Sequence, residues 1–350
     1  MLSRLRLTNF AGFPSADITW SPGLNLIVGE NGTGKSLLLK VAYSLGAVSA
    51  DMSKASRQGM DEWQRRIADK LRNTCRPEYL GRLVTRQQGR NRCEVKVDFS
   101  SGSPATSVAF NFASNARTEV KMKDSPTSRL EVPPVFIPTR EMLTIFPGFI
   151  ALYEERLLEF DETYFDIARA LNAVAFKKRA ASEQALIKKL EELMDGQIKL
   201  ENGRFYLHPS QSGKGAIEMH LVAEGVRKIA MLAYLLINGK LRSRGTLFWD
   251  EPESNLNPRL IRSVAEALVA LVRSGHQVIC ATHSLFLLRE LEILKAREGP
   301  STPAHYVGLS LDDETVRVEQ ADDLAGISTL VLLDEELQQS DRYLSLEGPR

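Results

Sequence analysis

The fold is decided by residues 23–48, which read GLNLIVGENGTGKSLLLKVAYSLGAV. The stretch begins with a short apolar run that ends at a glycine, as a buried strand does, and it closes with a segment of helical character. Between the two, residues 29–36 match the pattern Gly-x-x-x-x-Gly-Lys-Ser. A strand, a glycine-rich loop and a helix in this order are typical of a phosphate-binding loop, called the P-loop below.

The residue types in this loop suit a nucleoside triphosphate. Gly29, Gly32 and Gly34 allow the backbone to curl so that its N–H groups point at phosphate oxygens. We expect Lys35 to reach the β- and γ-phosphates and the Ser36 hydroxyl to ligate Mg²⁺. The sequence therefore predicts ATP and Mg²⁺ as cofactors. The predicted nucleotide contacts are Gly29, Glu30, Asn31, Gly32, Thr33, Gly34, Lys35, Ser36 and Leu37.

Two later apolar runs end in polar residues that complete such a site. TLFWDEPES (246–254) brings Asp250 and Glu251 to the end of a predicted strand, and QVICATHS (277–284) does the same for His283. Asp250 is expected to share the metal with Ser36, and Glu251 to polarise the attacking water. In an open parallel sheet the carboxyl ends of strands meet at the ligand crevice, so His283 is expected at the γ-phosphate or the water. The predicted catalytic residues are Glu251, His283 and Lys35.

The rest of the chain indicates a mixed α/β protein. LSRLRLTNF (2–10) and ADITW (16–20) alternate like two antiparallel strands, and RCEVKVDFS (92–100) alternates in the same way. Residues 149–195 are strongly helical and contain two apolar stripes, the second formed by Leu186, Leu190, Leu193 and Met194. Asn202-Gly203 between alternating runs predicts a hairpin. The residues of the first stripe are Leu157, Phe160, Tyr164, Ile167 and Leu171.

Composition limits the classes of partner. The chain has 350 residues with 45 Lys and Arg against 44 Asp and Glu, so its net charge of +1 gives no bulk attraction to nucleic acid or membrane. We find no apolar run of the roughly 18 residues that a membrane span needs, and no secretory signal at the start. We therefore expect a cytoplasmic protein with no membrane partner.

The order of the motifs resembles a known family. LRLTNF, GENGTGKS, AEGVRK, LFWDEPESNLNP and VICATHS follow one another as in ABC-type ATPases of the recombination-and-repair branch, which includes RecF, SMC heads and OLD-type proteins. The sequence is most similar to the small stand-alone bacterial AAA ATPases of that branch. The resemblance implies an α/β P-loop NTPase, an ABC-type ATPase head with an N-terminal antiparallel β-subdomain and an inserted helical lobe.

The resemblance also implies a division of the single head formed by residues 1–350. Residues 1–50 and 90–148 would form the nucleotide-binding lobe, and 149–232 the helical lobe with the hairpin and the signature helix. Residues 233–290 would carry the Walker B and histidine strands, and 291–350 the C-terminal strands and helix.

The family further implies a head-to-tail homodimer with two ATP molecules between the subunits. AEGVRK occupies the signature position, so Glu224, Gly225 and Lys228 would face the partner's nucleotide. Ala223 and Glu224 replace the Ser and Gly of the usual LSGG, whereas Gly225 is retained at the expected helix start. Asn255 and Asn257 match the D-loop near the dimer seam. Where a Q-loop glutamine is expected, FIPTRE carries Thr139 and Arg140, of which Arg140 is a weaker candidate contact.

Two functions remain open at this level. The first is a regulatory ATPase that controls a separately encoded effector, a nuclease or a toxin, in prokaryotic defence. The alternative is a DNA-repair ATPase that clamps DNA in its ATP-bound dimer, and a transport ATPase fits less well. An arginine-rich run is the candidate DNA contact, unless it is a solvated helix face. Its members are Arg57, Arg65, Arg66, Arg72, Arg86, Arg90 and Arg92.

Overall fold

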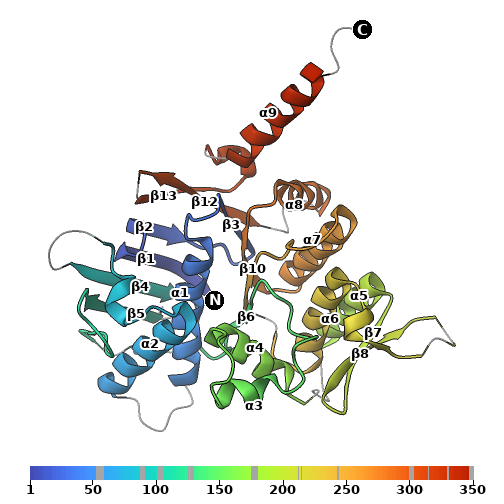
Figure 1. Ribbon diagram of the computed structural model, residues 1–350, viewed down its shortest axis with the longest axis horizontal. Helices are drawn as coiled ribbons and strands as arrows, with labels where there is room; N and C mark the ends of the chain where they lie inside the picture. The colour runs from blue at the N-terminus through green and yellow to red at the C-terminus, as the bar shows by residue number, and fades with distance from the viewer. Residues whose placement is uncertain are drawn as a thin grey trace.

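A six-stranded sheet forms the centre of the molecule in a computed structural model (Figure 1). The model describes the chain except residues 53–58, 87–90, 101–105, 125, 127–129, 175–179, 212, 214, 243, 299–302, 314, 329–330 and 347–350. The strand order is β13-β12-β3-β11-β10-β6, and all neighbours are parallel except β12 and β13. Its strands are β3 (Leu24–Gly29), β6 (Val135–Ile137), β10 (Thr246–Asp250), β11 (Gln277–Thr282), β12 (Ala304–Asp312) and β13 (Thr315–Ala321).

A second, antiparallel sheet lies beside it, in the order β2-β1-β4-β5. Its strands are β1 (Leu2–Phe10), β2 (Phe13–Thr19), β4 (Arg92–Phe99) and β5 (Thr106–Ala113). Leu5 and Leu7 of β1 are buried and alternate with partly exposed arginine, as a one-sided sheet requires. Helices α1 (Lys35–Met52) and α2 (Met60–Cys75) pack together next to this sheet. The expected antiparallel subdomain is confirmed.

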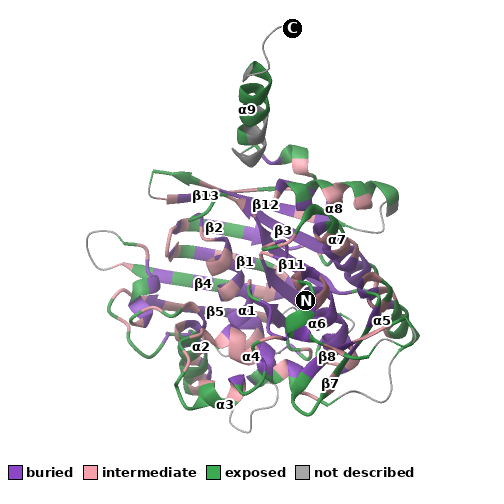
Figure 2. Ribbon diagram, turned by 45° about the vertical axis from the view of Figure 1, so that its right-hand side comes forward, coloured by how far each residue is buried: buried purple, intermediate pink, exposed green. Residues whose placement is uncertain are grey.

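Two hydrophobic cores cover the two faces of the central sheet. In β3, Ile27 packs with α1 and the antiparallel sheet, whereas Leu26 and Val28 face the core built with the helical part of the chain. This division follows from the alternation of side chains along a strand. Figure 2 shows the buried residues concentrated on the central strands and on the helices packed against them. Both faces of the sheet are therefore covered by packed side chains where its strands deliver the polar residues.

The helical lobe is more broken than the sequence pattern predicts. It contains α3 (Phe149–Glu154), α4 (Glu162–Leu171) and α5 (Ala181–Met194), followed by the small sheet β7 (Gly196–Glu201), β8 (Arg204–Pro209) and β9 (Ile217–Glu218). The first stripe is wrong at Leu157, which precedes α4 and is exposed, whereas Ile167 and Leu171 are buried and Phe160 and Tyr164 pack against the same core. The Asp161 carboxylate accepts a hydrogen bond from Thr163 N at 2.9 Å and starts α4 there.

The hairpin between β7 and β8 is confirmed. Asn202 and Gly203 have φ of 49° and 75°, the left-handed values that a tight two-residue turn requires. The remaining helices are α6 (Glu224–Ile237), α7 (Pro258–Arg273), α8 (Leu285–Glu298) and α9 (Val331–Leu346), with short 3-10 turns η1 (Leu80–Leu83), η2 (Met219–Leu221) and η4 (Leu324–Gly326). We did not predict α8. Helix α9 projects away from the body (Figure 1). Among the described residues, no helix has the length and apolarity to cross a membrane.

Candidate nucleotide site

The P-loop has the curled backbone that its glycines predict. It connects β3 to α1, and Gly32 and Gly34 have φ of 88° and 86°. A Cβ on Gly29 would lie 2.3 Å from the Leu309 carbonyl oxygen, so this position has no room for a side chain. A Cβ on Gly32 would meet nothing within 4 Å. Position 32 therefore favours glycine because of its left-handed backbone conformation, and not because a side chain would collide with a neighbour.

Lys35 is buried at the start of α1. Its Nζ donates hydrogen bonds to the carbonyl oxygens of Gly29 at 2.8 Å and Glu30 at 2.7 Å. Burial lowers the pKa of Lys35, and the nearby carboxylates of Glu251 and Asp250 oppose that shift. The loop thus wraps around one partly desolvated cation, which suits the binding of a phosphate group.

Ser36 and Asp250 meet at the end of β10. The Ser36 hydroxyl donates to Asp250 Oδ1 at 2.9 Å. Burial raises the pKa of Asp250 to about 6, although the hydrogen bond from Ser36 lowers it. Adjacent ligands of an octahedral Mg²⁺ with bonds of about 2.1 Å lie about 3.0 Å apart. The spacing and the oxygen chemistry of this pair therefore fit Mg²⁺.

Glu251 and His283 come together from neighbouring strands. Asp250 pairs with Ala281 in the sheet, so the residues that follow them lie at the same edge. Glu251 has a left-handed φ of 49° and donates its N–H to the Ala281 carbonyl at 2.9 Å. Its Oε1 lies 3.4 Å from His283 Nδ1, and both side chains are partly exposed. A carboxylate and an imidazole at this edge can polarise a water and contact a phosphate.

A third carboxylate belongs to this group and was missed from the sequence. Glu253 is buried, and its Oε1 accepts hydrogen bonds from the Thr282 hydroxyl at 2.6 Å and from His283 N at 3.2 Å. Its position in DEPES, two residues after Glu251, was the available signal. The turn after β10 brings it back to the end of β11.

The signature residues Glu224 and Gly225 lie in the first turn of α6, as expected, and both contact residues of their own chain. Helix α6 begins at Glu224, whose Oε1 accepts a hydrogen bond from Asn255 Nδ2 of its own chain at 3.4 Å. A Cβ on Gly225 would lie 2.9 Å from Leu260 Cβ, so this glycine is needed where α6 packs on α7. Asn255 is exposed with a φ of 60°, and Asn257 caps α7 by accepting a hydrogen bond from Leu260 N at 3.0 Å.

Lys228 does not lie on the surface. It is 1% exposed, and its Nζ donates to Pro252 O at 3.2 Å, Ser254 O at 2.8 Å and Ser254 Oγ at 3.1 Å. In this structure its charge therefore holds the turn after β10 rather than facing a partner. The neighbouring Arg227 pairs with Glu141 at 2.9 Å, and Arg140, the weaker Q-loop candidate, is exposed.

Comparisons with known proteins agree with this geometry. The family model described as "AAA domain" matches residues 4–203, and a second one, "AAA domain, putative AbiEii toxin, Type IV TA system", matches residues 138–289. The DNA replication and repair protein RecF of Klebsiella pneumoniae is 47% identical over 112 residues, or 31% of this chain and 30% of RecF. The Old nuclease of Escherichia phage P2 is 51% identical over 47 residues, 13% of this chain and 8% of that protein. The chain thus spans less than a third of these curated relatives.

Solved structures share the fold. The SmcHead bound to the C-winged helix domain of ScpA has a TM-score of 0.55 at 16% identity, covering 92% of this chain and 97% of the other. The SMC head domain from Thermotoga maritima has a TM-score of 0.51 at 14% identity, covering 91% and 98%. The family match over more than half of its length shows that the chain belongs to the AAA-domain family, and the likeness to these structures shows that it shares the fold of SMC heads.

Proposed function

We propose that the protein is a regulatory ATPase that binds ATP with Mg²⁺, forms a head-to-tail dimer around two nucleotides, and controls a separately encoded effector. The observation that carries the nucleotide part is the convergence of Lys35, the Ser36–Asp250 pair and the Glu251–His283 pair at one edge of the central sheet. Phosphoryl transfer depends on positioning and charge, and these are the groups that it uses.

Each residue has a defined task in this proposal. Lys35 exchanges its bonds to the Gly29 and Glu30 carbonyls for phosphate oxygens. Ser36 and Asp250 hold Mg²⁺, which when bound neutralises phosphate charge. Glu251 accepts a hydrogen bond from the attacking water, and His283 donates to the γ-phosphate.

The first turn of α6 supports a role in the partner's site. Its N-cap residue, Ala223, makes no side-chain cap hydrogen bond, so that no capping side chain competes with a ligand for the N–H groups of the first turn. The positive end of the helix dipole adds to the attraction for a phosphate. With no hydroxyl at Ala223, the backbone of α6 would recognise the partner's nucleotide, and the Glu224 side chain would stay on its own Asn255.

The dimer can be tested with Glu251→Gln, which removes the negative charge that polarises the water but retains the shape of the side chain. With ATP and Mg²⁺ this variant should accumulate as a dimer by light scattering, and Lys35→Met added to it should restore the monomer. A Glu251→Gln protein that stays monomeric while binding ATP would overturn the sandwich.

Control of an effector rests on similarity and on exposed apolar residues. One matching family model names a toxin–antitoxin system, the phage relative is a nuclease, and the SmcHead structure contains a segment of ScpA. On the helical lobe, Leu152 and Leu157 are exposed large apolar side chains, and Ile145 just before the lobe is exposed as well. We propose that this lobe contacts the effector, whose candidate is the product of the adjacent gene. Binding of that product should depend on ATP and fall in the Leu152→Ser/Leu157→Ser variant; equal binding with and without ATP would contradict the proposal.

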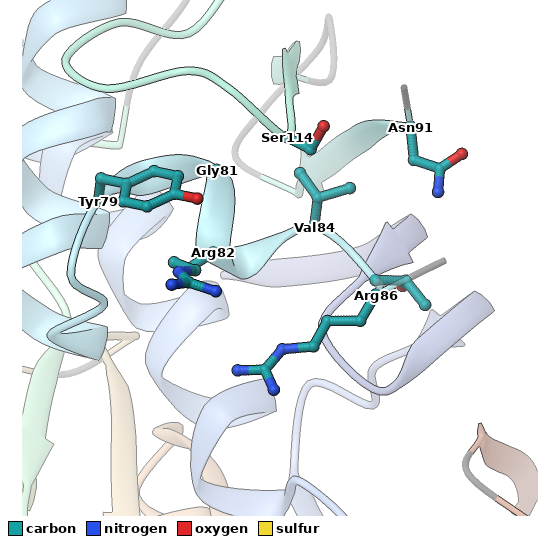
Figure 3. Close-up of a pocket in the computed structure, with 8 residues that line it drawn as sticks. Tyr79, Gly81, Arg82, Val84, Arg86, Asn91 and Ser114 are labelled. Carbon is teal, nitrogen blue, oxygen red and sulfur yellow. The ribbon is translucent and has the colours of Figure 1, made fainter. Parts of the chain in front are cut away.

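A DNA clamp is the second candidate, favoured by the RecF similarity and by one basic pocket. A pocket of about 380 Å³ is lined by Tyr79, Arg82 and Arg86, among others. Figure 3 shows both guanidinium groups on the same side of this pocket. The Arg82 guanidinium carbon lies 5.2 Å from the centre of the Tyr79 ring, and that of Arg117 lies 5.8 Å from it.

Most of the predicted arginine run has other partners. Arg65 and Arg66 pair with Glu62, Arg72 pairs with Asp69, and Arg92 bonds to the Asn111 side chain. Arg57 and Arg90 lie outside the described residues.

Of the run, Arg86 is therefore the best DNA candidate. For a clamp, DNA binding should require ATP, weaken with salt and weaken further in Arg86→Ala, because each phosphate contact releases counterions. Salt-insensitive binding in every nucleotide state would exclude this candidate.

A further inference from the structure

Glu253 is buried in a way that stability does not explain. The residue is 5% exposed, and its Oε2 has no hydrogen-bond partner among the residues that the structure describes. A buried carboxylate with an unpaired oxygen costs free energy compared with an apolar residue of the same volume. Such a group at the edge of a ligand site indicates a functional constraint.

The other carboxylate oxygen reaches across from the turn after β10 to the end of β11. Glu253 Oε1 accepts hydrogen bonds from the Thr282 hydroxyl at 2.6 Å and the His283 N–H at 3.2 Å. Thr282 is fully buried, and its hydroxyl oxygen accepts a hydrogen bond from Ser284 N at 3.0 Å. The Ser284 hydroxyl in turn accepts one from Leu287 N at 3.2 Å in the first turn of α8. Glu253 therefore fixes the backbone that carries His283.

The charge of Glu253 is balanced inside the same site. Its carboxylate favours the charged forms of Lys35 and Lys228, although burial lowers the pKa of both lysines. Both cations therefore attract the buried carboxylate in a region from which water is largely excluded.

We infer that Glu253 is a positioning residue that sets the place and orientation of His283 for ATP hydrolysis. Glu253 Oε1 accepts the backbone N–H of His283, and His283 Nδ1 lies 3.4 Å from Glu251 Oε1 and 3.8 Å from Glu253 Oε1, so Nε2 is the ring nitrogen that the proposed contact with the γ-phosphate would use. This inference rests on the proposed role of His283 at the γ-phosphate. It assigns the second glutamate of DEPES a task separate from the catalytic task of Glu251.

The test is a double-mutant cycle on steady-state ATPase rates. Glu253→Ala should lower kcat by about 10²-fold with little change in KM, the size of loss expected when a catalytic side chain is displaced by about 1 Å. Glu253→Gln retains an acceptor oxygen and should lose less. Where Glu253→Ala fails to fold, Thr282→Val removes the hydroxyl donor and should lower kcat in the same way.

The decisive arm uses His283→Ala as background. There Glu253→Ala should cost almost nothing more, because the side chain that it positions is already absent. Glu292→Ala is the matched control, because Glu292 is a carboxylate on α8 that accepts a bond from the Tyr306 hydroxyl; its effect should be the same in both backgrounds. If Glu253→Ala lowers kcat in the His283→Ala background as much as it does in the parent protein, the inference is wrong, but the proposed role of His283 stands. No loss in His283→Ala itself overturns the role of His283, and the inference with it.

Discussion

Two lysines, the buried Lys35 and Lys70, whose side chain is 10% exposed, show how the same residue type serves a ligand in one place and the fold in another. Within the described part of the chain, Lys35 donates hydrogen bonds to backbone carbonyls of the P-loop and to no side chain, and burial lowers its pKa. Lys70 on α2 pairs with Glu162 at 2.9 Å and with Asp166, both on α4. Burial also opposes the charge of Lys70, yet these two carboxylates together raise its pKa.

The two lysines differ in the groups that compensate their positive charge. Asp166 also accepts a hydrogen bond from the Tyr43 hydroxyl at 2.7 Å, so α1, α2 and α4 are joined around Lys70. The charge of Lys70 is thus compensated by side chains that fold with it. Lys35 has nearby carboxylates but no ion pair of its own among the described residues, so an anionic ligand can still gain from it. Incomplete pairing, rather than burial, distinguishes the nucleotide site.

The largest expected effect comes from removing the ligand-facing cation. Lys35→Met should lower ATP turnover by at least about 10²-fold, because a preorganised charge on the transferred phosphate is lost. Its thermal midpoint should not fall, since the change removes a desolvated charge without breaking a side-chain ion pair. Turnover is measured by phosphate release. A variant that keeps its turnover would show that Lys35 does not bind the transferred phosphate group.

The next effect concerns the fold. Lys70→Met should lower the free energy of unfolding by about 3–5 kcal/mol, because two carboxylates are left without their buried cation. ATPase activity per folded molecule should be preserved. Urea titration measures the first quantity, and Arg65→Met, which breaks an exposed pair with Glu62, serves as the control with a change below about 1 kcal/mol. An unchanged urea midpoint would show that the ion pairs of Lys70 do not stabilise the fold.

The smallest effect tests whether a lowered pKa alone marks a functional group. His276 precedes β11 at the end opposite to His283, is fully buried, and burial lowers its pKa below 6.5. The unfolded chain therefore binds this proton first, and stability is lost as pH falls below 6.5 towards the lower pKa of the folded state. His276→Gln should flatten the fall in thermal midpoint between pH 7 and 5 and leave ATP turnover unchanged. A lower ATP turnover in this variant would contradict the view that a pKa lowered by burial does not by itself mark a functional group.

The sequence predicted the parts of the site that follow strand ends. The P-loop, Asp250, Glu251 and His283 each come directly after an apolar run, and parallel pairing then brings them to one edge. It did not predict contacts between distant segments. A side chain at Gly225 would collide with Leu260. The buried Lys228 donates hydrogen bonds to Pro252 and Ser254, and Glu253 accepts one from Thr282.

The hydrophobic pattern of the sequence also failed to predict where two helices begin. Asp161 starts α4 in the middle of an apolar stripe, so Leu157 stays outside the helix. Helix α8 follows His283 directly and is buried through Leu287 and Leu288, although its weak amphipathic pattern did not indicate a helix. In both cases the deciding contact is a hydrogen bond or a tertiary packing that periodicity does not record.

The most direct test of the comparison is the shift in thermal midpoint on adding ATP with Mg²⁺ to Lys35→Met and Lys70→Met. A ligand that binds only the folded state raises the midpoint, so the shift reports the site and the starting value reports the fold. We predict that Lys70→Met starts lower than the parent protein and keeps the full ATP-induced shift, whereas Lys35→Met starts no lower and loses it. A Lys35→Met protein that keeps its shift, or a Lys70→Met protein that loses it while folded, would contradict the separation of the two lysines.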